Sequence, residues 1–144
     1  MIYTEETKKA LKLAFKAHKD QLDKGGLPYI YHPLHLAEQM KDEDTTVTAL
    51  LHDIVEDTNY TMEDLRQMGF RESVCRALEL LTHDESVPYM EYISKIKENP
   101  VAKAVKLADL QHNSDLSRLE STSLNESTYK RLEKYKEAIA LLSS

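Results

Sequence analysis

Four ionisable side chains lie within an apolar run of the sequence, at His52, Asp53, Glu56 and Asp57. If this run is helical, Glu56 lies four residues after His52 and three after Asp53, so the three side chains are neighbours on one face. Burying charges is costly unless something compensates them, and a divalent cation does this well. The imidazole of His52 and the carboxylate of Asp53 form a mixed donor set that suits Mn, Fe or Zn. This pair alone is compatible with a metal site and with a helix end whose polar residues are solvated, so the rest of the chain must decide between them.

Two further segments carry candidate ligands. His32 precedes Pro33, which suits the first turn of a helix, so His32 is expected at or beside the N-cap, outside the regular helix. Asp109 interrupts an apolar helical run, where a carboxylate is rarely left without a partner, and Asn113 follows one turn later on the same face. Together with the first His-Asp pair, these segments supply two imidazoles and two carboxylates.

Helical periodicity runs through the chain and no alternation of period two persists, so the sequence predicts an all-α fold. Seven or eight helices are expected, with bounds near 5–22, 34–40, 45–57, 61–69, 72–81, 89–97, 101–119 and 129–142. Thr4 and Thr61 are expected to cap two of them, and Thr45 or Thr46 to open the central one. The 144 residues are expected to form one domain, residues 1–144, built as a helical bundle. Bundles of this kind hold metals between facing helices.

Four segments resemble the HD superfamily of metal-dependent phosphohydrolases, whose pattern is His, then His-Asp, then Asp. The resemblance is stronger to the hydrolase domain of the RelA/SpoT family and its small stand-alone relatives, which remove pyrophosphate from the 3′ position of the alarmone (p)ppGpp with Mn. It extends over roughly residues 10 to 120 and implies a single HD-type hydrolase domain. The matching segments are His18–Pro33, Ala49–Thr58, Leu80–Thr82 and Val105–Asn113.

The resemblance implies a role for each candidate residue. Glu56 and Asp57 would orient and activate the attacking water, Asn113 would contact the nucleotide, and Lys24 would meet a phosphate. The substrate would be a small anionic nucleotide, and the metal Mn²⁺, with Zn, Fe and Mg left open. The residues implied to hold one metal ion are His32, His52, Asp53 and Asp109.

The sequence departs from this family at Asp23, where the family has an arginine that is expected to stack on the guanine base. An aspartate cannot stack as a cation and would repel a phosphate. We therefore expect poor hydrolysis of (p)ppGpp, or another preferred substrate, and improved hydrolysis in an Asp23→Arg variant. Two alternatives remain open: an HD hydrolase of another nucleotide or phosphate ester, and a non-enzymatic, metal-stabilised nucleotide-binding module.

The other reactive residue types are expected to have structural roles. His18 is expected to be a hydrogen-bonded core or cap histidine, and the pair His83-Asp84 to be solvated surface. Cys75, the only cysteine, is expected to pack as a small hydrophobe. A single cysteine excludes an intramolecular disulfide and fits a reducing compartment, here the cytoplasm.

Charge and hydropathy exclude some classes of partner. The net charge of −6 argues against binding of nucleic acid or an anionic membrane surface, because both rely on Lys and Arg to neutralise phosphate. No apolar stretch approaches the ~20 residues that a membrane span requires. The sequence makes no prediction of oligomeric state.

Overall fold

The computed structural model describes residues 1–144, and its regular secondary structure is all helical, apart from an isolated antiparallel bridge between Leu22 and Pro28. The all-α prediction is therefore confirmed. No helix combines the length and apolarity needed to cross a membrane. The helices are α1 (Glu5–Ala17), α2 (Tyr31–Glu38), α3 (Glu43–Leu51), α4 (Ile54–Asp57), α5 (Met62–Gln67), α6 (Glu72–Leu81), α7 (Tyr89–Lys97), α8 (Pro100–Asn113), the 3₁₀ turns η1 (Leu116–Arg118) and η2 (Ser121–Ser123), and α9 (Glu126–Ser143).

Short polar side chains set the helix starts. Thr4 and Thr61 accept hydrogen bonds from backbone N–H groups of the first turns of α1 and α5, as the sequence predicted. The central helix starts earlier than expected, because Asp42 rather than a threonine accepts the first free N–H. The last helix also starts earlier, at its cap Asn125. In each case the cap satisfies a donor that would otherwise have no partner.

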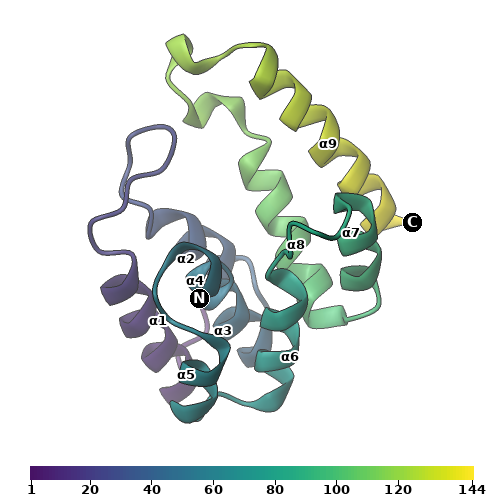
Figure 1. Cartoon of the computed structure of the whole chain (residues 1–144). Helices are drawn as coiled ribbons and strands as arrows, with labels where there is room; N and C mark the ends of the chain where they lie inside the picture. The colour runs from purple at the N-terminus through teal and green to yellow at the C-terminus, as the bar shows by residue number, and fades with distance from the viewer.

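Helix α3 forms the centre of the core. It is buried from Thr45 to Leu51 and packs against α1, α2, α6 and α8; Figure 1 shows it between α1 and α6. Cys75 of α6 is fully buried in the same core, so its predicted packing role is confirmed. Because α3 is enclosed on all sides, the residues that follow its last turn emerge among several helices.

The predicted helix 45–57 is interrupted at His52 and Asp53. His52 ends α3, and Asp53 adopts φ −104° and ψ 4°, which leaves helical geometry before α4 begins. A second correction concerns His32, which lies inside α2, whose N-cap is Ile30. The expected helices 5–22 and 101–119 are also shorter, since α1 ends at Ala17 and α8 at Asn113.

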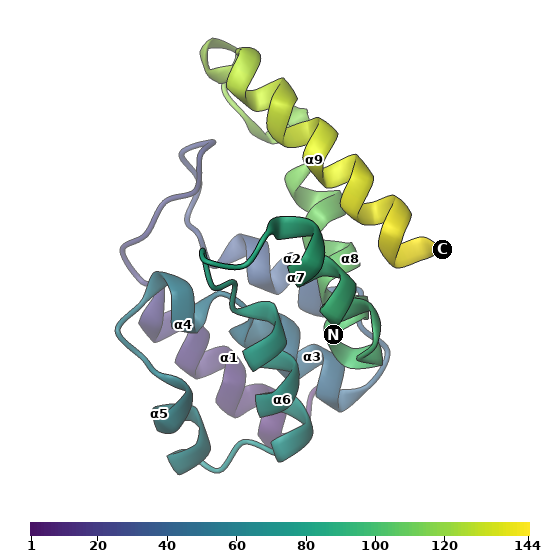
Figure 2. The same ribbon diagram turned by 45° about the vertical axis from the view of Figure 1, so that its right-hand side comes forward.

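Helix α9 lies along one edge of the molecule, where it packs on α7 and α8. Figure 2 shows its first turns projecting on the same side as the loop that joins α1 to α2. Residues of this loop and of α9 line a common pocket, together with residues at the ends of α2 and α8.

Candidate functional site

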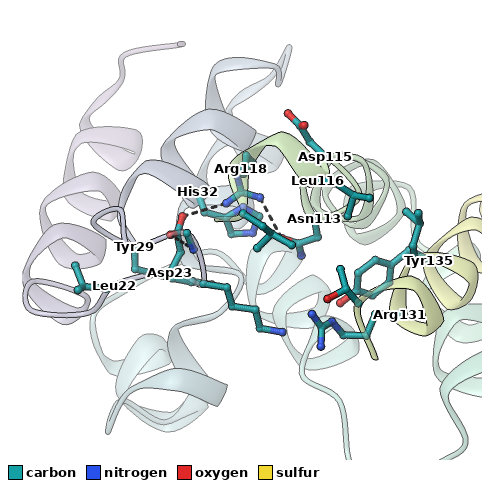
Figure 3. Close-up of a pocket in the computed structure, with 15 residues that line it drawn as sticks. Leu22, Asp23, Tyr29, His32, Asn113, Asp115, Leu116, Arg118, Arg131 and Tyr135 are labelled. Carbon is teal, nitrogen blue, oxygen red and sulfur yellow. Dashed lines mark hydrogen bonds and ion pairs between the residues drawn. The ribbon is translucent and has the colours of Figure 1, made fainter. Parts of the chain in front are cut away.

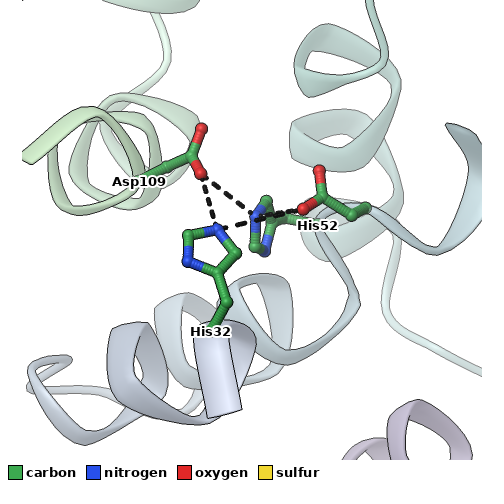
Figure 4. Close-up of side chains that lie close together, drawn as sticks. His32, His52 and Asp109 are labelled. Carbon is green, nitrogen blue, oxygen red and sulfur yellow. Dashed lines mark hydrogen bonds and ion pairs between the residues drawn. The ribbon is translucent and has the colours of Figure 1, made fainter. Parts of the chain in front are cut away.

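The four predicted metal ligands lie together where α2, α8 and the α3–α4 junction meet. Each offers one ligand atom, and these atoms all lie within 4.8 Å of one another. His32 Nε2 is 2.8 Å from Asp109 Oδ1, and His52 Nε2 is 3.4 Å from the same oxygen. Asp53 Oδ2 lies 2.8 Å from His52 Nε2. Figure 4 shows the two imidazoles and the Asp109 carboxylate directed at a common centre.

This cluster is buried and charged, which is the condition that a cation relieves. His32, His52 and Asp109 are each at most 6% exposed, and the buried His52 Nε2 makes no hydrogen bond. Burial opposes the charged form of His52, but the Asp53 and Asp109 carboxylates outweigh it and raise its pKa. Burial likewise opposes ionisation of Asp109, but Lys106 and the two histidines hold its pKa well below the usual range. Two nitrogens and two oxygens that converge within 4.8 Å fit a divalent transition metal.

A surrounding set of side chains orients the four candidate ligands. His52 Nδ1 lies 2.7 Å from the Ala49 carbonyl oxygen, and Lys106 Nζ donates to Asp109 Oδ2 at 3.0 Å. The Tyr29 hydroxyl donates to Asp53 Oδ2. Such contacts fix which atom of each ligand faces the metal. Sequence reasoning assigned no role to Lys106 or Tyr29, although both lie within the segments that carry the resemblance.

Glu56 lines a pocket of about 160 Å³ together with His52, Asp53 and Asp109. Burial, followed by the charge of Asp53, raises its pKa, although a hydrogen bond from the His83 backbone N–H works in the opposite direction. A carboxyl group with a raised pKa beside a metal site suits a general base. Asp57 lies outside this pocket, but burial and the charge of Asp53 raise its pKa as well.

His83 is not the solvated residue that the sequence suggested. Its ring stacks on Tyr92 with centroids 4.4 Å apart, and its Nε2 lies 2.8 Å from the Val87 carbonyl oxygen. Its backbone N–H donates to the Glu56 carboxylate, so this loop holds Glu56 in the pocket. Asp84 is exposed, as expected. His18 is buried with Nδ1 2.9 Å from Gln21 Oε1, which agrees with the predicted structural role.

A larger pocket, of about 340 Å³, begins at His32 and opens between the α1–α2 loop and α9 (Figure 3). Lys24 lies on one wall and Arg131 on the other, while Asn113 lines both this pocket and the smaller one, which Lys134 also lines. Burial and the charges of Arg131 and Lys134 lower the pKa of Lys24. None of these three cations forms an ion pair with a carboxylate, so together they favour an anion.

A profile of the HD domain family matches residues 10–113, which include all four candidate ligands. The chain belongs to this family. The mouse guanosine-3′,5′-bis(diphosphate) 3′-pyrophosphohydrolase MESH1 is 38% identical over 128 residues, covering 78% of this chain and 71% of that protein. The protein of the same name from Xenopus tropicalis is 40% identical, with 68% of its length covered.

Longer proteins also match this HD domain over a small part of their length. A guanosine-3′,5′-bis(diphosphate) 3′-pyrophosphohydrolase of Aquifex aeolicus is 34% identical over 123 residues, which are 77% of this chain and 18% of that protein. Among solved structures, a metazoan orthologue of SpoT described as hydrolysing ppGpp superimposes with a TM-score of 0.77 at 26% identity. The match covers 99% of this chain and 88% of that one.

Asp23, the residue at which the HD domain departs from the expected pattern, is not a free negative charge in the pocket. Its Oδ2 lies 3.3 Å from Arg118 Nη2, and its Oδ1 accepts hydrogen bonds from the backbone N–H groups of Gly25 and Leu27. Arg118 therefore counters the charge that was expected to repel a phosphate. Arg118 was not a sequence candidate, because nothing in a local pattern links it to a residue 95 positions earlier.

Proposed function

We propose that this HD domain is a metal-dependent phosphohydrolase that removes pyrophosphate from the 3′ position of (p)ppGpp. The observation that carries the proposal is a buried cluster of two histidines and two aspartates beside two pockets whose walls carry three cations without acidic partners. The first feature fits a catalytic metal, and the second fits a small nucleotide with several phosphates. The names of the MESH1 relatives support this choice of substrate.

The proposed resident metal is Mn²⁺, held by His32, His52, Asp53 and Asp109. When bound, it supplies Lewis acidity, which polarises a phosphoryl oxygen and makes water more acidic. Zn²⁺, Fe²⁺ and Mg²⁺ are the competing ions, and the mixed nitrogen and oxygen donor set favours a transition metal over Mg²⁺.

The residues of the chain perform the remaining steps. Water adds to the phosphorus that is bonded to the ribose 3′ oxygen, that P–O bond breaks, and pyrophosphate leaves while the 3′ oxygen regains a proton. Glu56 accepts the proton of the attacking water, and Asp57 orients this water. Lys24 binds a phosphate as a point charge, and Asn113 contacts the nucleotide beside Asp109.

A second candidate is hydrolysis of another nucleotide or phosphate ester by the same groups. The pairing of Asp23 with Arg118 favours it, because the loop offers the base no cation at that position. The non-enzymatic alternative has less support, since every residue that the resemblance assigns to the metal and to the attacking water is present.

Turnover of a nucleotide panel tests the proposal. The protein would be stripped of metal, reloaded separately with Mn²⁺, Zn²⁺, Fe²⁺ or Mg²⁺, and given ppGpp, pppGpp, GTP and deoxynucleoside triphosphates. We expect equal amounts of GDP and pyrophosphate from ppGpp with Mn²⁺. Turnover of another compound in preference to ppGpp would establish the second candidate, and no turnover of any compound would contradict the enzymatic proposal.

A further inference from the structure

A direct ion pair at the larger pocket joins the α1–α2 loop to the segment that follows α8. Arg118 ends η1, just after α8, and its guanidinium reaches Asp23 in the loop between α1 and α2 (Figure 3). The two side chains are only 19% and 11% exposed, so water and salt screen this pair less than a surface pair. Arg118 Nη1 also donates to the His112 carbonyl oxygen at 2.9 Å, which orients the guanidinium.

The backbone of the loop provides a second, independent contact at the same place. Gly25 packs so closely on Arg118 that an added Cβ would overlap the Arg118 carbonyl oxygen. Only a glycine permits this approach of two backbones. The loop therefore contacts the segment after α8 at two points. An ion pair joins them at Asp23, and their backbones pack closely at Gly25.

These contacts surround the groups that are proposed to bind the substrate. Lys24 lies between the two anchored residues Asp23 and Gly25. Asn113 lies on the other side of Arg118, with its Oδ1 3.5 Å from Arg118 Nη1. Arg118 thus connects the loop that carries Lys24 with the end of α8 that carries Asn113.

We propose that the Asp23–Arg118 ion pair is a latch that holds Lys24 and Asn113 at a fixed separation across the pocket, and that Arg118 is a positioning residue for an anionic nucleotide. The inference rests on the proposed function and adds a determinant of affinity to it. It reverses one expectation from the sequence: Asp23→Arg places a second guanidinium against Arg118, removes an acceptor for two loop N–H groups, and weakens binding.

A double-mutant cycle of Asp23→Asn and Arg118→Gln tests the latch. The side-chain amide that Asp23→Asn introduces keeps an oxygen for the Gly25 and Leu27 N–H groups, so this change removes the charge without removing the acceptor. Each single variant is expected to raise KM for ppGpp roughly three- to thirtyfold with kcat and Mn²⁺ content unchanged. The KM of the double variant should be no higher than that of the single variant with the higher KM, because the two changes break the same ion pair. Arg66→Gln, which breaks an exposed ion pair with Glu79, is the matched control and should leave KM unchanged.

Two measurements that need no turnover separate failure of the latch from failure of the proposed activity. The first is the dissociation constant of inorganic pyrophosphate by calorimetry, and the second is hydrogen exchange of the Gly25 and Leu27 amides. The latch predicts weaker pyrophosphate binding and faster exchange in Arg118→Gln, whatever the natural substrate is. Unchanged affinity for ppGpp and pyrophosphate in both single variants, or strictly additive effects in the double variant, would overturn the proposal even if exchange becomes faster.

Discussion

The Nδ1 atoms of His32 and His112 lie 2.7 Å apart, in rings whose planes are nearly parallel, with an angle of 4° between them. One nitrogen must carry the proton of this contact. Burial, followed by the charge of Arg118, lowers the pKa of His112 to about 4, so His112 is neutral and can accept. Donation by His32 Nδ1–H leaves its Nε2 lone pair directed at the proposed metal. His112 thus selects the tautomer of a candidate ligand.

We predict that His112→Phe, which keeps a ring but removes the acceptor, lowers Mn²⁺ affinity roughly 10- to 100-fold. Competition with a chelator of known affinity measures the change. His35→Phe is the matched control, because His35 stacks on His112 at 4.1 Å but makes no hydrogen bond to His32. Equal affinity in the wild type and His112→Phe would remove His112 from the metal centre.

The lowered pKa of His112 also predicts a pH dependence of stability in the metal-free protein. Between about pH 6.5 and pH 4 the unfolded chain binds a proton at this residue that the folded chain does not, so the free energy of unfolding decreases as the pH falls through this range. Above about pH 6.5 His112 is neutral in both the folded and the unfolded chain, so the free energy of unfolding has its full value with respect to this residue. Urea unfolding of the wild type and His112→Phe at several pH values checks this: the variant should lose stability less steeply.

Glu56→Gln is expected to keep the metal and to lose most turnover. Glu56 is not among the four clustered ligand atoms, and general acid–base catalysis contributes about 10²–10⁴ in rate. Metal analysis after desalting and kcat measured with saturating substrate test the two parts separately. If metal is lost in proportion to turnover, Glu56 is a ligand; if kcat is unaffected, another group accepts the proton.

Asp109→Ala is expected to abolish metal binding and to destabilise the fold by about 3–5 kcal/mol, because Lys106, whose side chain is only 14% exposed, loses its partner. Adding Lys106→Met should restore much of the stability, since it removes the uncompensated charge, but should not restore the metal. Denaturant unfolding and metal analysis of the three proteins distinguish the effects. A double variant as unstable as Asp109→Ala would show that the lost stability does not come from Lys106.

Most local features of this chain were determined by its sequence. Helical periodicity and short polar caps depend on neighbours within about one turn, so the all-α class and caps such as Thr4 and Thr61 could be predicted. The pattern of His32, His52, Asp53 and Asp109 also named the members of the cluster that the structure brings together. Their spacing suggested a continuous helix through His52, however, and that part of the prediction was wrong.

The tertiary structure decided which distant groups meet. The break at Asp53 directs a carboxylate toward α8, the loop at His83 holds Glu56, and Arg118 meets Asp23 across 95 residues of sequence. These contacts depend on how helices pack around α3, and packing joins residues that no local period relates. An aspartate that looked repulsive in the sequence therefore became one half of an ion pair, because the charge of a side chain acts on whatever the fold places beside it.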